Sequence, residues 1–114
     1  MKIIKLTPHA INFEGNGIVT SFPPSGDVAR VAVTQHRINS PVYLGGVFPL
    51  FVRTTGEVEN LPKWEEGKIY IVSGMVREAL GKTRPDVIAP DSGATAIRDS
   101  QGRITSVTQF IGVL

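Results

Sequence analysis

Short strand-forming runs, each ended by turn-forming residues, constrain the fold of this chain more than any other feature. The runs rich in β-branched and apolar residues are "KIIKLT" (2–7), "HAINF" (9–13), "IVTSF" (18–22), "VARVAVTQHRI" (28–38), "KIYIV" (68–72) and "RPDVIAP" (84–90). Such runs are typical of strands rather than helices. The residues "EGNG" (14–17) tolerate positive φ, so they predict a hairpin between the second and third runs.

The remaining segments are less regular. Residues 42–55 predict either two strands around a glycine turn or one long strand with a bulge. Residues 56–67 are polar and predict a loop, with Trp64 as a local anchor. Residues 99–103, "DSQGR", predict a hairpin turn, and residues 103–114 a closing strand.

One segment has a helical pattern. In "SGMVREALG" (73–81), Ser73 suits the N-cap and Gly81 suits the left-handed position after the last turn. We therefore expect a mainly β (α+β) protein with one short helix near 73–81. Its architecture would be a small β-barrel or a curled antiparallel or mixed sheet, in a single domain over residues 1–114.

Composition excludes several function classes. The chain has no cysteine, which rules out disulfides and thiolate metal sites, and its two histidines make a histidine-based zinc site unexpected. The net charge is only +2, with basic residues scattered among acidic ones, which argues against specific nucleic-acid binding. No apolar run approaches the ~20 residues of a membrane span. We expect a soluble, cytoplasmic protein with no cofactor and no bound metal.

Four segments hold candidate binding residues. In "TPH", Thr7 and His9 could face a ligand, or Pro8 could simply end strand pairing. In "VRTTGE", Arg53 offers a phosphate-binding fork beside Thr54, Thr55 and Glu57, but an ordinary strand end with a salt bridge fits as well. These alternatives, taken on the residues alone, favour the structural role in each case.

The other two segments follow the same logic. The junction "IVSGMVR" could hold an anion through Ser73 and Arg77, or Ser73 could only cap the helix. In "APDSGATAIRD", Asp91 and Asp99 with Arg98 could form an acid-rich binding loop, but nothing marks the two carboxylates as a catalytic pair. No phosphate-loop, nucleophile-elbow or triad pattern is legible, so we disfavour an enzyme.

Four pieces of the chain, in order, resemble a known family. They are "KLTPHAINF", "PPSGDVARV", "VRTTGEVENLP" with "EEGKIYIVSGMV", and "VIAPDSGATAIRDSQGRI". Together they are similar to the small phage, prophage and bacterial proteins that open on "N-L-T-P-H" and have no settled activity. This chain departs from the family by having Lys5 where asparagine is usual, and by a glycine- and aromatic-rich segment at 40–50.

The resemblance implies a phage setting, in which compact non-catalytic proteins often counter host defence. We therefore expect a homo-oligomeric accessory protein that sequesters a small anionic, nucleotide-like signalling ligand. The expected donors are Thr7, His9, Arg53, Thr54, Thr55, Glu57, Ser73, Arg77, Asp91 and Arg98, with Tyr43, Phe48, Phe51 or Trp64 as an apolar wall. One alternative is a protein-interaction or virion-associated module with an exposed edge strand or aromatic patch at 42–51. The other is a small nucleotide hydrolase that uses His9 with Asp91 or Glu57.

Overall fold

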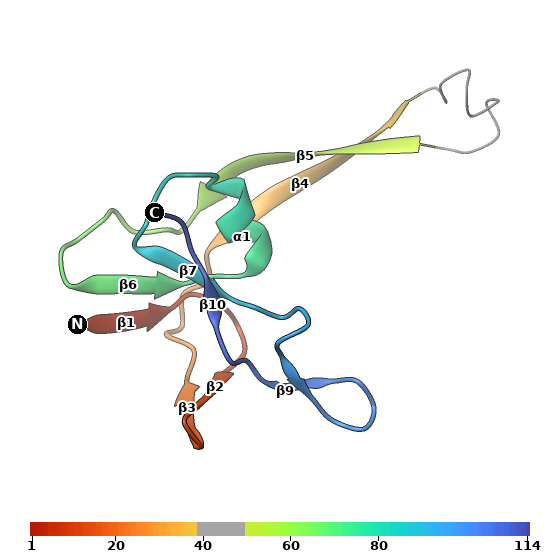
Figure 1. Cartoon of the computed structure of the whole chain (residues 1–114). Helices are drawn as coiled ribbons and strands as arrows, with labels where there is room; N and C mark the ends of the chain where they lie inside the picture. Colours follow the sequence, from red (N-terminus) through yellow and green to blue (C-terminus); the bar gives the residue numbers. More distant parts are fainter. Residues whose placement is uncertain (39–49) are drawn as a thin grey trace.

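The computed structural model describes residues 1–38 and 50–114 (Figure 1). Its body is a four-stranded sheet in the order β1-β6-β7-β10. The strands are β1 (Lys2–Lys5), β6 (Lys68–Ile71), β7 (Val87–Pro90) and β10 (Phe110–Ile111). The first three run parallel and β10 runs antiparallel to β7, so the sheet is mixed.

A β-α-β unit forms the centre of this body. The predicted strand at 68–72 has Tyr70, Ile71 and Val72 fully buried, as expected for a central parallel strand. Helix α1 (Gly74–Ala79) is the crossover between β6 and β7. Its predicted caps are confirmed, because the Ser73 hydroxyl accepts from the Val76 amide at 3.3 Å and Gly81 has a φ of 60°.

The hydrophobic core lies between α1 and one face of this sheet. Its buried members are Leu6, Ala29, Tyr70, Val72, Val76 and Val87. Leu6 follows β1 directly, and Ala29 is tied to it by a 3.1 Å bond from the Ala29 amide to the Leu6 carbonyl. The core is small for a chain of this length, since the long segments outside it add only partly buried residues, Val31 and Val58, at its edge.

Those segments are three two-stranded ribbons that leave the body in different directions (Figure 1). They pair β2 (Ile11–Gly15) with β3 (Ile18–Phe22), β4 (Arg30–Ile38) with β5 (Leu50–Glu59), and β8 (Ile97–Arg98) with β9 (Ile104–Ser106). Aromatic contacts of Phe110 with Phe13 and Phe22 fasten the first ribbon to β10. The β4–β5 ribbon is the longest and extends farthest from the body (Figure 1).

The predicted class, mainly β with a curled sheet and one short helix, is confirmed. Of the two architectures expected, no sheet closes into a barrel within residues 1–38 and 50–114. The loop predicted at 56–67 is wrong for its first part, because β5 continues to Glu59. Trp64 is 62% exposed and is no anchor. The closing strand is split into β9 and β10, and residues 39–49 lie outside the described part.

Candidate functional site

The Thr-Pro-His corner after β1 is built around a buried lysine. The Lys5 ammonium donates to the carbonyl and hydroxyl oxygens of Thr7, at 2.8 and 2.6 Å, and to the carbonyl of His9. Three acceptors match the three donors of an ammonium group. Burial lowers the pKa of Lys5. The Thr7 hydroxyl is therefore used inside the fold, and His9 contributes its backbone while its side chain stays exposed.

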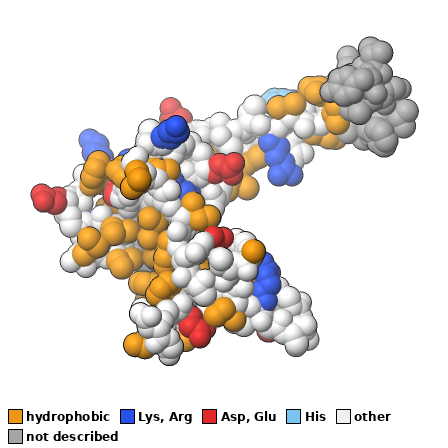
Figure 2. All heavy atoms as spheres, viewed as in Figure 1, with side chains coloured by type: hydrophobic (Ala, Val, Ile, Leu, Met, Phe, Trp, Pro, Cys, Tyr) orange, Lys and Arg blue, Asp and Glu red, His pale blue; other side chains and the backbone are white. Residues whose placement is uncertain are grey.

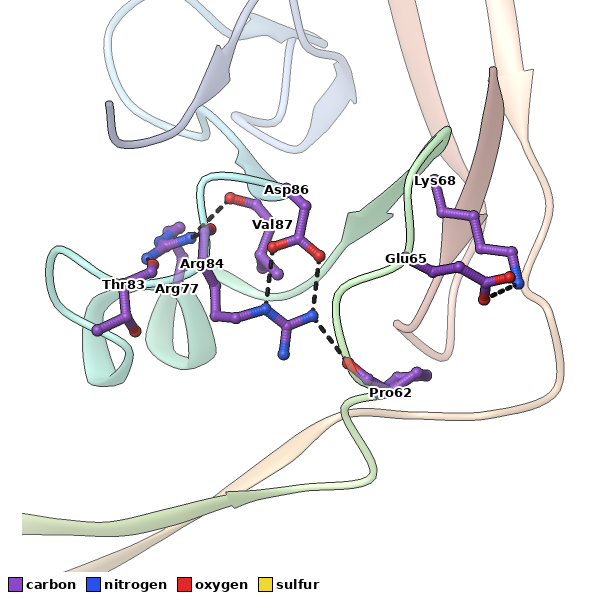
Figure 3. Close-up of polar contacts among 8 residues, drawn as sticks. All are labelled: Pro62, Glu65, Lys68, Arg77, Thr83, Arg84, Asp86 and Val87. Carbon is purple, nitrogen blue, oxygen red and sulfur yellow. Dashed lines mark hydrogen bonds and ion pairs between the residues drawn. The ribbon is translucent and has the colours of Figure 1, made fainter.

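A second polar cluster holds the connection between α1 and β7 (Figure 3). Arg77 is only 4% exposed. Its two terminal nitrogens donate to the carbonyls of four residues, at 2.5 to 2.9 Å: Gly81, Thr83, Arg84 and Val87. Each terminal nitrogen carries two hydrogens, so both are saturated. Desolvation lowers the pKa of Arg77.

Arg84 and Asp86 form a two-bond ion pair beside it (Figure 3). Arg84 Nε and Nη2 donate to the two Asp86 carboxylate oxygens at 2.9 and 2.8 Å, and Nη2 also donates to the Pro62 carbonyl at 2.7 Å. The hydrogen bond from Arg84 holds the pKa of Asp86 below its ordinary value. This pair fixes the loop that enters β7 and joins it to the chain before β6.

Asp91 and Arg98 stabilise loops rather than face a common cleft. The Asp91 carboxylate accepts from the Gly93 amide at 2.9 Å and from the Gln109 side chain at 2.7 Å, and these bonds lower its pKa. Arg98 donates to the carbonyls of Gly102 and Ser92 at 2.8 and 2.9 Å. The "DSQGR" turn is confirmed by the 2.8 Å bond from the Asp99 amide to the Arg103 carbonyl.

The "VRTTGE" motif lies on β5 in the projecting ribbon. Residues paired in register across two antiparallel strands point to the same face. One face, which we name the inner face, carries Val33 with Thr55, Gln35 with Arg53, and Arg37 with Phe51. The other, the outer face, carries Thr34 with Thr54, His36 with Val52, and Ile38 with Leu50. Nearer the body the register shifts at a bulge, where Gly56 and Glu57 lie opposite Ala32.

Two open hollows flank Met75 on α1. One has about 310 Å³ and is lined by Val33, Arg53, Thr55, Met75, Glu78 and Ala79, so the inner face looks toward the helix. The other has about 320 Å³ and includes Thr7, Ser73 and Met75 in its lining. The structure thus brings Arg53 to Thr55, and Thr7 to Ser73. It does not bring Arg77, Asp91 or Arg98 to either hollow.

The end of the β4–β5 ribbon that lies far from the body exposes apolar side chains (Figure 2). On the outer face Ile38 and Val52 are 43% and 45% exposed, and on the inner face Phe51 is 57% exposed. Two-stranded ribbons are marginally stable in water unless a further strand or layer covers them. Within the described residues no further strand pairs with this ribbon, and helix α1 lies only against its inner face near the body.

The whole chain has more surface than its mass requires. Its accessible surface is 8098 Å², whereas a folded monomer of 12.3 kDa is expected to have about 6,100 Å². Its radius of gyration is 17.4 Å, against about 13 Å for a compact domain of this length. The surplus of roughly 2,000 Å² reflects how far the chain extends beyond a compact body.

Comparison with known proteins adds no family. No family model, no curated protein and no solved structure matches the chain. The one helix of the described residues is too short to cross a membrane. Among those same residues, no group of three His, Asp or Glu side chains gathers as a metal ion would need. The site must therefore be interpreted from its own geometry.

Sequence reasoning missed the residues that do most in this geometry. In the sequence, Lys5 differs from the expected pattern without indicating a buried role, and Arg84 and Asp86 belong to none of the candidate segments. The signal for the pair was present, because a carboxylate two residues after an arginine across a proline can close a tight turn. No local sequence pattern predicts that the β4–β5 ribbon is uncovered, since its exposure depends on how far the ribbon extends beyond the four-stranded sheet.

Proposed function

We propose that this chain is a non-catalytic protein-interaction module that binds its partner with the β4–β5 ribbon. The proposal rests on the end of this ribbon far from the body. There both faces are open to solvent, and Ile38, Phe51 and Val52 are exposed. Monomeric proteins seldom leave a long projecting element with apolar side chains on both faces, and such surfaces mark interaction sites. A partner that covers the ribbon supplies the layer that a stable sheet needs.

The distribution of predicted binding residues supports the same choice. Arg77 spends its terminal donors on four carbonyls, and the Thr7 hydroxyl is bonded to Lys5. Asp91 and Arg98 hold their own loops. Apart from the Nε of Arg77, which is buried without a partner, these groups are satisfied inside the fold and have little left for a ligand. Binding a protein partner through the ribbon does not require these residues, because such an interface depends on apolar area rather than on convergent donors.

Affinity capture with a matched pair of variants tests the ribbon. Val52→Lys places a charge on the outer face, whereas the control Ile18→Lys changes another exposed apolar residue, 67% exposed, beside the β2–β3 turn. Tagged protein would be recovered from cells that also express untagged chain. We expect a protein retained by the wild type and by Ile18→Lys, and lost from Val52→Lys. Equal retention by the two variants would contradict the proposal.

Ligand sequestration is a second candidate, and one observation favours it. Arg53 and Thr55, both expected as ligand donors, line the same hollow of about 310 Å³ beside α1. Arginine at such a place can bind phosphate or carboxylate, and Met75 and Val33 provide an apolar wall. The hollow is open to solvent, so a subunit packed across it would be needed to enclose a nucleotide-like ligand.

Native mass spectrometry tests this second candidate. Protein would be taken directly from cells with and without nucleotide-signalling defence systems. Sequestration predicts a retained molecule of nucleotide mass (on the order of several hundred daltons), present only with the signalling enzyme and reduced in Arg53→Ala. Bare protein in both kinds of cell would remove this candidate and leave the interaction module.

A further inference from the structure

The partner of the ribbon can be identified more closely, on the premise that the proposed interaction function is right. The two faces of the ribbon differ in charge. The inner face carries Arg37 and Arg53, whereas the outer face carries no Lys, Arg, Asp or Glu between residues 33–38 and 50–55. The outer face also looks away from α1, because the hollow beside the helix is lined by inner-face residues.

The net positive charge of the chain comes from the same stretch that contains the ribbon. Residues 33–56 contain two arginines and no acidic residue. The remaining ten Lys and Arg residues equal the ten Asp and Glu residues, so the formal charge of +2 belongs entirely to this stretch. An anionic partner would therefore be attracted to the inner face, where both arginines lie. The outer face has no Lys or Arg side chain to attract such a partner.

An uncharged face suits contact with its own copy. In a two-fold contact the same patch meets itself, so any charged residue near the axis faces a like charge. The outer face avoids that repulsion and instead offers Ile38, Leu50 and Val52 with hydroxyls from Thr34 and Thr54. Aliphatic side chains from two such faces can interdigitate, as they do between the layers of a β-sandwich.

We propose that the chain forms a two-fold dimer in which the outer faces of two β4–β5 ribbons pack against each other. The result is a four-stranded, two-layer stalk with layers about 10 Å apart. Each ribbon supplies the layer that the other lacks, which explains why a long ribbon persists beyond the body.

The stalk also leaves the inner faces outward. Arg37, Arg53 and the exposed ring of Phe51 would then be displayed twice, once on each side of the dimer. The hollow lined by Arg53 and Thr55 stays accessible in this arrangement, because it lies between the inner face and α1. Dimer formation through the outer face therefore predicts that inner-face substitutions leave the dimer intact.

Two adjacent threonines give a matched test. Thr54 is on the outer face and Thr55 on the inner face, so Thr54→Lys and Thr55→Lys make the same chemical change on opposite sides of β5. Sedimentation velocity should show a dimer for wild type and for Thr55→Lys. For Thr54→Lys the dimer dissociation constant should rise at least tenfold, with an unchanged far-ultraviolet circular dichroism spectrum for the body.

Cysteine cross-linking provides a second measurement that does not depend on weakening the dimer. The chain contains no cysteine, so a single introduced thiol can form a disulfide only with another copy. On oxidation with copper phenanthroline, Val52→Cys or Thr54→Cys should give a covalent dimer. Phe51→Cys and Thr55→Cys, on the inner face, should stay monomeric on a non-reducing gel.

The outcomes separate this inference from the proposed function. A wild-type monomer at all concentrations, or a dimer equally sensitive to Thr54→Lys and Thr55→Lys, would overturn the two-fold stalk. If such a monomer still retains a different protein in a Val52-dependent way, the interaction function stands with another partner. If nothing is retained through the ribbon, both fail.

Discussion

Arg77 is an interior scaffold at the residue scale, because one guanidinium holds four carbonyls of the connection to β7. We expect Arg77→Ala to lower the free energy of unfolding by about 3 kcal/mol, since it leaves buried acceptors without donors. The exposed Arg98→Ala should cost less than about 1 kcal/mol. Urea unfolding of both variants measures this. Equal costs would mean that Arg77 does not organise the loop.

Asp86 should make the folding stability of the chain depend on pH in the acid range. Its hydrogen bonds from Arg84 lower the pKa of the folded carboxyl below the value of about 3.8 in the unfolded chain. The unfolded state then binds more protons, so this stabilisation is present above pH 4 and is lost as pH falls through the folded pKa. Asp86→Asn should be less stable than wild type at pH 7, with the difference shrinking as pH falls below about 4.

Urea midpoints across this pH range measure the difference, and a constant gap between the two proteins would contradict it. Arg84→Gln should show the same flattened profile as Asp86→Asn, because the two groups act as one pair. The Arg84–Asp86 pair shows that local sequence patterns do not reveal contacts made when a loop closes. Ser73 was predictable as a cap since its partner lies three residues away, but Arg77 and Asp86 depend on how a loop closes in space.

The β4–β5 ribbon carries the prediction at the scale of elements. If a second copy covers it, amide hydrogens of residues 33–38 and 50–55 should be protected from exchange in the dimer. In the Thr54→Lys monomer they should exchange far faster than those of β6, because a lone ribbon is marginally stable. Hydrogen–deuterium exchange followed by mass spectrometry measures both. Fast exchange of the ribbon in wild type as well would count against a covered ribbon.

Elements with local signals were predictable from sequence. The "EGNG" turn, the capped helix and the buried run at 68–72 each follow from neighbouring residues. The end of β5 was not, because the polar residues from 56 onward predict a loop, although the backbone continues the strand through a bulge. The parallel pairing of β1 with β6 was not predictable either, since nothing local links segments so far apart.

At the scale of the whole molecule, dimerisation should be coupled to stability. A chain whose ribbon is ordered by its partner gains stability by mass action, so the melting temperature should rise with protein concentration. Calorimetry of wild type over a hundredfold range in concentration should show this rise, and Thr54→Lys should lack it. A concentration-independent wild type would indicate that the ribbon needs no second copy.

The pairing of β1 with β6 has a consequence for synthesis of the chain. Lys2 lies opposite Lys68, and β6 in turn needs β7 beside it. Strand β1 therefore leaves the ribosome well before β6 and β7 and waits for them before it can pair. Contacts between such distant segments slow folding. Until then the apolar residues of β1 stay open to other proteins, so chaperones that bind nascent chains should act on this one early.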